Sequence, residues 1–193
     1  MKKFLLFCIA LVVAGSGSVA PSADQPAYDF RKIRWGMNPD QVKATEGKPV
    51  SDDKGILVYD MTVDGYDVSL YYTFVDSQLV SAMYAFKVKH NNPQDYLDDF
   101  TKVKAILQQK YGAPKLDKVD WKDNLYKGDP EHWGLAVSVG ALAYSTVWEN
   151  SSTQIGEALW GDKFEVKFAV RYSSKALAGL AASAEKKKAL DVF

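Results

Sequence analysis

Cysteine is almost absent from this chain, since Cys8 is the only one among 193 residues. It lies in an apolar N-terminal segment that we expect to be removed. The mature chain would then contain no disulfide, no thiolate metal site and no cysteine nucleophile. A mature chain of roughly 170 residues is long enough to bury a core without covalent cross-links.

An excess of charge is also lacking, because 24 Lys and Arg residues balance 24 Asp and Glu residues. Removal of Lys2 and Lys3 with the N-terminal segment would leave a net charge of −2. A chain of this balance has no basic field that attracts nucleic acid or anionic lipid. We therefore predict no nucleic-acid partner.

Long hydrophobic runs are missing too, and the apolar run near the N-terminus is too short for a membrane span of ~20 residues. Residues 1–20 instead have the order of a secretory signal peptide: two lysines, an apolar core and a small-residue region. We expect cleavage between about 18 and 23 and a periplasmic or secreted protein. Cys8 follows Leu5-Leu6-Phe7, which lacks the small residues of a lipid-attachment site, so we expect no lipid anchor.

Histidine is nearly as scarce as cysteine, since His90 and His132 are the only two. We interpret His90, beside Asn91-Asn92, as an exposed turn residue and place His132 in the first turn of a third helix, beside Glu131. Two histidines and a carboxylate are zinc ligands in other proteins, but the chain has no His-x-x-x-His spacing. The sequence predicts no metal site.

Other catalytic patterns are missing as well. The chain has no Gly-x-Ser-x-Gly motif and no glycine-rich phosphate loop, and Ser151-Ser152 lie in a predicted hairpin turn. Asp52-Asp53 fall in a turn and Asp98-Asp99 on the polar face of a helix, which favours solvation over a glycosidase carboxylate pair. We predict no catalytic, cofactor-binding or metal residues, no cofactor, and no enzyme activity.

Residues 37–49, by contrast, carry nearly every signal of a short helix. Asn38 is the predicted N-cap, Pro39 the first helical residue, and Gln41 completes a capping box. Met37 and Val42 occupy the positions of a hydrophobic staple. The Gly-Lys-Pro sequence that follows stops a helix, so we predict one over about 39–46.

Alternating apolar residues predict strands in both halves of the chain, with Asp64-Gly65 as a favoured hairpin turn and residues 51–55 as a solvated turn. The predicted strands are 56–62, 66–74, 79–88, 142–149, 153–160 and 163–173.

A second helix opens the second half, with Asn92 as the predicted cap and Pro93 at the first position. Its apolar stripe is Tyr96, Phe100, Val103 and Leu107, and Gly112 ends it. Within 130–139 a helix is favoured over a strand, although both remain open. Residues 174–193 form a marginal C-terminal helix or tail.

The order of elements predicts an α+β fold of two tandem helix-plus-meander units, with helices on one face of an antiparallel sheet. The first unit covers 28–90. The second covers 91–173 and carries an insertion at 115–145. This repetition indicates an internal duplication.

The segment from Ile33-Arg34-Trp35-Gly36-Met37 to Gly47-Lys48-Pro49 resembles small periplasmic domains of the SmpA/OmlA (BamE) type. The resemblance implies a helix and an antiparallel meander, a fold shared with the β-lactamase-inhibitor-protein family, whose members repeat the unit in tandem. It covers 33–86 well and 92–173 only in outline. The chain departs from the short assembly lipoproteins in lacking their lipid-attachment cysteine and in adding the second unit. It looks more like two-unit uncharacterised exported proteins.

Aromatic residues make up 13% of the chain, and they carry the remaining hypotheses. Core packing is the favoured role for each tryptophan, and contact with a partner is the alternative. The five are Trp35, Trp121, Trp133, Trp148 and Trp160.

Our main hypothesis is a non-enzymatic binding or scaffold protein of the cell envelope. Its partner would be an envelope protein or peptide, held by the open sheet face or the loop at 115–130. A small-ligand or glycan binder with an aromatic sheet face is the first alternative, and a hydrolase with an unrecognised site is the second.

Overall fold

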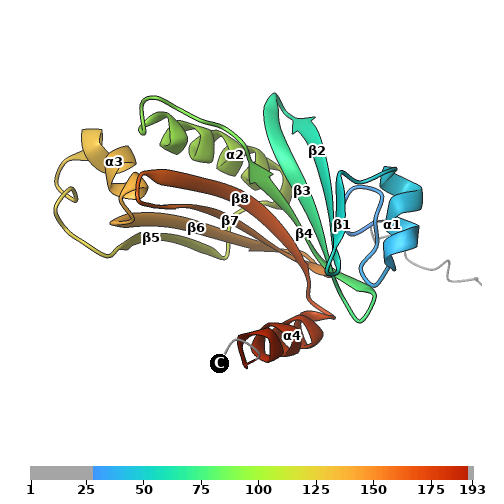
Figure 1. Cartoon of the computed structure of the whole chain (residues 1–193). Coiled ribbons are helices and arrows are strands. Elements are labelled where there is room, and N and C mark those ends of the chain that lie inside the picture. The colour runs from blue at the N-terminus through green and yellow to red at the C-terminus, as the bar shows by residue number, and fades with distance from the viewer. Residues whose placement is uncertain (1–27, 191–193) are drawn as a thin grey trace, which may run out of the picture.

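The computed structural model describes residues 28–190, and its fold is α+β, with one eight-stranded antiparallel sheet and four α-helices (Figure 1). The strands are β1 (Ser51–Asp53), β2 (Ile56–Val63), β3 (Tyr66–Val75), β4 (Gln78–Phe86), β5 (Leu116–Trp121), β6 (Leu142–Glu149), β7 (Thr153–Asp162) and β8 (Glu165–Ser174). The predicted signal peptide and its cleavage site lie outside the described residues.

The order of strands across the sheet is β1-β2-β3-β4-β8-β7-β6-β5. Strands β4 and β8 pair at the centre, with Tyr84 opposite Val170, and so join the two halves of the chain. The edges are formed by β1 and β5. The sheet is therefore continuous across both halves.

Tight turns of the predicted kind connect the hairpins. Asp64 and Gly65 have φ values of 49° and 82°, the left-handed conformation that a two-residue hairpin loop requires. Lys163 and Phe164 repeat it between β7 and β8, with φ values of 50° and 67°. Strand β8 consequently begins at Glu165, two residues later than we predicted from the alternating pattern.

The predicted first helix is confirmed as α1 (Pro39–Glu46). The Asn38 side chain accepts a hydrogen bond from the Gln41 backbone N–H at 2.9 Å, and the Gln41 side chain accepts one from the Asn38 N–H at 2.9 Å. This is the predicted capping box. Gly47, with a φ of 90°, follows the last helical residue.

The start of the second helix was predicted wrongly, because α2 spans Asp95–Tyr111 and has Gln94 as N-cap. Asn92 accepts a hydrogen bond from the Gln94 N–H and so forms a turn before the helix instead of capping it. The predicted apolar stripe is confirmed: Phe100, Val103 and Leu107 are buried, and Leu97 joins them.

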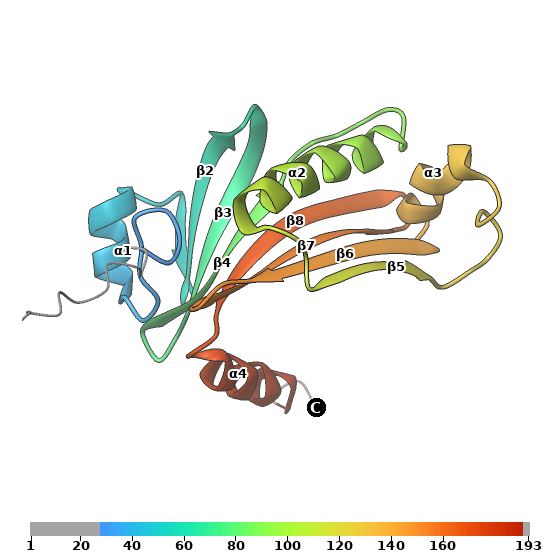
Figure 2. The same cartoon turned by 180° about the vertical axis from the view of Figure 1, so that it is seen from behind.

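Helix α2 lies over β6, β7 and β8 on one face of the sheet (Figure 2). This side holds the core, where the largest fully buried side chain belongs to Trp148. The Trp148 indole N–H donates to the Gly112 carbonyl at 3.0 Å, which ties the end of α2 to β6. The same side also buries Val42 of α1.

Residues 130–139, for which a helix was favoured over a strand, are helical in most of their length. A 3-10 turn (Pro130–His132) leads into α3 (Trp133–Ser138). A Cβ at Gly161 would stand 2.4 Å from the Val137 carbonyl, so only glycine lets β7 approach α3 this closely.

Two strands were missed by the sequence prediction. Residues 51–53, expected in a turn, form β1, and 116–121, expected in a loop, form β5. Both lie at the edges of the sheet and are mostly exposed. Buried and exposed residues do not alternate in these two strands, so the alternating apolar pattern used to predict strands was not present.

The last helix corrects the prediction that the helices share one face of the sheet. Helix α4 (Ala178–Leu190) lies on the face opposite α2 and α3 (Figure 1). The Ser174 hydroxyl accepts from the Leu177 N–H at 3.2 Å and so caps the turn that leads into it. We call the face on which α4 lies the open face.

Candidate functional site

The two histidines are held apart in different networks. The His90 and Asp99 side chains are in contact, with Nε2 and Oδ2 2.5 Å apart, whereas the His132 ring meets Asp129 at 2.7 Å. Among residues 28–190, no group of three His, Cys, Asp or Glu side chains is placed to hold a metal ion. His90 is half-buried rather than an exposed turn residue, as its side chain is 25% exposed.

The adjacent acidic pair in α2 was also interpreted wrongly. Asp99 is buried, not on the polar face, and it accepts a hydrogen bond from the Tyr66 hydroxyl at 2.9 Å in addition to its His90 contact. Burial and this hydrogen bond raise the pKa of Tyr66 to about 12. The Asp99 cluster cross-links β3, α2 and the segment after β4.

The remaining candidate side chains have local structural contacts. Asp52 pairs with Lys43 of α1 at 2.8 Å. The Ser152 hydroxyl lies 3.2 Å from that of Thr153, inside the hairpin turn where it was predicted.

Four tryptophans pack in or against the core, namely Trp35, Trp121, Trp133 and Trp148. Trp160 differs, because its side chain lies on the open face and the residue is 40% exposed. The core-packing interpretation therefore holds for four of the five, and Trp160 is the one candidate for contact with a partner.

Small side chains form the middle of the open face. The strand register places Ser69, Ala85, Ala169, Ala158 and Ser145 in one row across five strands. Side chains of this size leave a low floor above which another element can approach the sheet closely.

The next row of the open face is apolar except at its centre. It runs through Tyr71, Met83, Arg171, Gly156 and Val147. Its centre, Arg171, donates to the Ser81 hydroxyl at 3.5 Å and lies 3.7 Å from the Glu185 carboxylate of α4. Both contacts are long for a guanidinium group.

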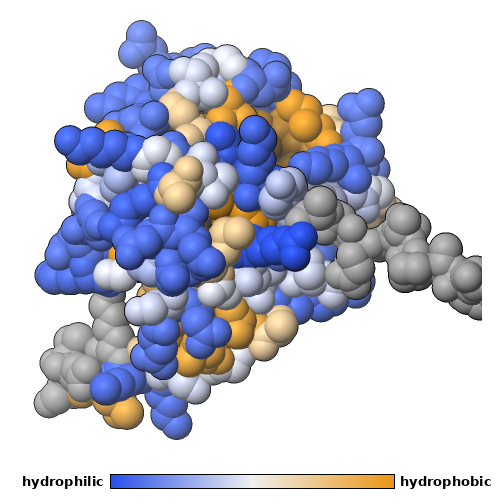
Figure 3. All heavy atoms as spheres, turned by 90° about the vertical axis from the view of Figure 1, so that its right-hand side faces the viewer, coloured by the Kyte–Doolittle hydropathy of each residue, from blue (hydrophilic) through white to orange (hydrophobic). Residues whose placement is uncertain are grey.

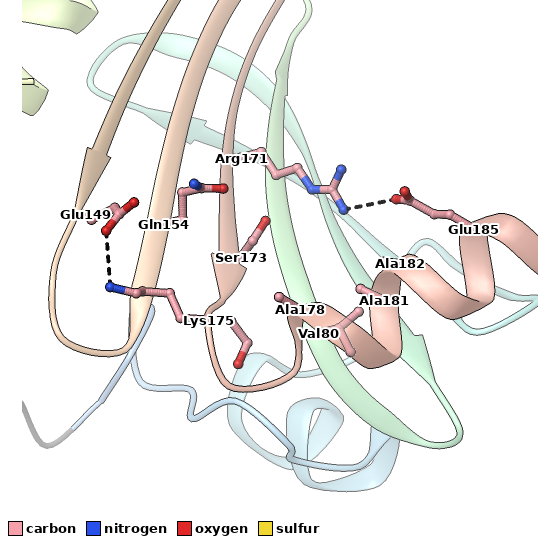
Figure 4. Close-up of a pocket in the computed structure, with 11 residues that line it drawn as sticks. Val80, Glu149, Gln154, Arg171, Ser173, Lys175, Ala178, Ala181, Ala182 and Glu185 are labelled. Atoms are coloured by element: carbon pink, nitrogen blue, oxygen red, sulfur yellow. Dashed lines mark hydrogen bonds and ion pairs between the residues drawn. The ribbon is translucent and has the colours of Figure 1, made fainter. Parts of the chain in front are cut away.

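Two hollows lie between α4 and the open face, one on each side of Arg171. One, of about 440 Å³, is lined by Glu149, Gln154 and Ser173 (Figure 4). The other, of about 390 Å³, is lined by Ile56 and Met83. Arg171, Ala181 and Glu185 line both, so the hollows form one trough that α4 divides; we call it the α4 trough.

The side chains that line this trough carry three positive charges, on Lys54, Arg171 and Lys175, and two negative charges, on Glu149 and Glu185. Lys54 forms no ion pair with another described residue, and neither does Lys167 farther along β8. Arg171 has only the loose contact with Glu185. Glu149 is shared between Lys115 at 2.7 Å and Lys175 at 3.1 Å. These two lysines lower the pKa of the Glu149 carboxyl, so it stays ionised.

Viewed from the side of α1, hydrophobic side chains gather in separate areas among hydrophilic ones (Figure 3). Among the described residues, no helix is both long and apolar enough to span a membrane.

In comparisons with known proteins, no family model, curated protein or solved structure matches the chain. The α4 trough was missed by the sequence prediction. Its sequence signal is weak, because Arg171 shares the outward positions of a regularly alternating strand with two other charged residues, Glu165 and Lys167.

Proposed function

We propose that this protein is a non-enzymatic binding protein of the cell envelope, and that its open sheet face binds a protein partner. One observation carries the proposal: cationic side chains without firm carboxylate partners lie on the open face beside the row of small residues. Lys167 and Arg171 flank Ala169 of that row along β8, and Lys54 lines one of the hollows.

Charge favours an acidic partner segment. An exposed cation that lacks an internal partner is free to pair with an incoming carboxylate, and such charges steer association and fix register. The apolar side chains beside Arg171 supply burial around the charged contact, as in the usual arrangement of an interface core. Tyr71 and Met83 lie next to Arg171 in this row.

The charge reversals Arg171→Glu and Lys167→Glu test this proposal. The purified chain is used to capture proteins from envelope extract, and affinity for the recovered partner is then measured with each variant. We expect each reversal to weaken binding at least tenfold, because it replaces attraction with repulsion.

The matched control is Lys102→Glu on α2, whose side chain is 68% exposed on the other side of the sheet. We expect it to bind as the wild type does. Equal loss of affinity in all three variants would show that net charge matters and the open face does not. Failure to capture any partner at native abundance would also refute the proposal.

A glycan or another small ligand is the second candidate, favoured by the exposure of Trp160. Aromatic rings that stand free on a sheet are a common platform for such ligands. Tryptophan fluorescence titrated with envelope glycans would change in the wild type and remain flat in Trp160→Ala.

We also infer that the two halves descend from one duplicated unit. Each half contains a helix followed by four antiparallel strands, and the strand order is mirrored about β4 and β8. Superposition of 38–86 on 94–174 tests this inference, since an origin by duplication requires the strands to match in order and direction.

A further inference from the structure

Helix α4 fills the α4 trough poorly. The residues that line the trough from α4 are Ala178, Ala181, Ala182, Ala184 and Glu185. A methyl group is too short to occupy the space between a helix and a sheet at ordinary packing density, which explains the two hollows. Among the α4 residues whose burial the structure describes, none belongs to the buried core.

The polar attachment of α4 is also weak. Among the described residues, its one ion pair to the sheet is Arg171–Glu185, with side chains 46% and 71% exposed. Exposed pairs of this length contribute little, and an isolated helix of 13 residues is marginal in water. The structure therefore holds α4 in place by alanine contacts and one loose charge contact.

We propose that the α4 trough is a groove for a partner's amphipathic helix, and that α4 occupies it only as a displaceable cover. This inference rests on the proposed binding function of the open face. The partner helix spans about three turns, matches Arg171 with a carboxylate, and carries larger apolar side chains where α4 has alanine. These side chains fill the hollows on both sides of Arg171. The additional apolar surface that they bury favours the partner helix over α4 and so displaces α4.

Two observations favour a helix as the bound element of the partner: the position of α4 on this face and the charge of the side chains around it. Helix α4 shows that this face accepts helical backbone, with a glutamate directed at Arg171 (Figure 4). Lys54 at the border of the trough, which forms no ion pair with another described residue, favours a further acidic residue on the polar face of the entering helix.

A pair of fluorescent peptides tests this proposal on the full-length chain. The first, called the alanine peptide, has the sequence of residues 176–190 with glutamine in place of Lys186, Lys187 and Lys188, so that Glu185 is its one charged side chain. The second, called the leucine peptide, is the same peptide with Ala181→Leu and Ala184→Leu. The protein is used as the wild type and as Glu185→Lys, which places a cation against Arg171 and loosens α4. Glu131→Lys, at the exposed 3-10 turn, is the charge-matched control.

We expect the leucine peptide to bind at least tenfold more tightly than the alanine peptide, because its larger side chains fill the hollows. Binding to the Glu185→Lys chain should be stronger than to the wild type or to Glu131→Lys. Arg171→Glu should weaken it at least tenfold. Hydrogen exchange should become faster in α4 when the leucine peptide binds, which a second site elsewhere would not cause.

Absence of saturable binding to the Glu185→Lys chain would overturn the proposal, as would equal affinity for the Arg171→Glu chain. A further outcome separates this inference from the proposed function. If a captured envelope partner loses affinity for Lys167→Glu but is not displaced by the leucine peptide, the open face binds its partner and the helix groove is wrong.

Discussion

Glu157 is buried in the core without a partner, and replacing it should stabilise the protein. It lies on β7 between Thr146 of β6 and Val170 of β8, and the residue is 1% exposed. Neither of its carboxyl oxygens has a hydrogen-bond partner. The nearby Lys104 ammonium group contacts Asp117 instead, at 2.6 Å.

Burial raises the pKa of the Glu157 carboxyl from 4.5 to about 8, with a partly opposing effect of Lys104 and a further increase from Asp117. The folded state then holds a proton that the unfolded state releases above pH 4.5. Stability is consequently full below that pH, falls as pH rises, and levels off above about 8. At about 1.4 kcal/mol per unit, the loss is roughly 3 kcal/mol at pH 7 and at most about 5 kcal/mol above pH 8.

The test is urea unfolding of the wild type and Glu157→Met between pH 5 and 9. Methionine has a similar length and no charge, and it adapts to irregular core space. We expect the free energy of unfolding of the variant to exceed that of the wild type by a margin that grows with pH. The exposed Glu165 provides the control variant Glu165→Gln, which should follow the wild type.

Groups that both chains share contribute equally to both, so they cancel in the difference between Glu157→Met and the wild type. Burial raises the pKa of Tyr72 and of Tyr172, so these groups reduce stability only at higher pH. The lowered pKa of Asp60 acts only below the range. A constant difference between Glu157→Met and the wild type from pH 5 to 9 would refute the reasoning, because it would mean that Glu157 ionises freely in the folded protein.

Three further substitutions test the fold, each by the midpoint of denaturant unfolding. Asn38→Ala should cost about 1 kcal/mol through loss of the α1 cap, and an unchanged midpoint would argue against the capping box. His90→Ala should cost about 1–3 kcal/mol because it leaves buried Asp99 short of a partner, and a neutral result would show that water replaces the ring. Gly161→Ala should cost more than about 2 kcal/mol, since its Cβ would stand 2.4 Å from the Val137 carbonyl; normal stability would mean that α3 shifts freely.

Local signals in the sequence predicted most of the fold. The capping box at Asn38 and the hairpin at Asp64-Gly65 depend on neighbouring residues, and both occur as predicted. The edge strand β5 has five exposed residues out of six, so its position follows from pairing with β6, which no local pattern encodes. The place of α4 was likewise unpredictable, because its alanines define no strong apolar stripe.

The candidate site depends on contacts between distant parts of the chain. Arg171 and Glu185 are close in sequence, but the row that holds Arg171 draws on five strands from both halves. The burial of Asp99 could not be predicted from the sequence either. Asp98 and Asp99 are adjacent residues of the same type, and only the way α2 packs on the sheet determines which of them is buried. The types of the side chains were enough to predict most helices and strands. The residues that make up the open face could be listed only once the register between β4 and β8 was known.

Site-specific photo-crosslinking in the cell envelope tests the central claim most directly. A photoreactive residue is placed at position 167 on the open face and, in a second variant, at position 102 on α2. The proposed function predicts a covalent adduct with a protein partner from position 167 and none from position 102. Adducts from position 102 alone would contradict it, since contact with the partner would then lie on the helical side of the sheet.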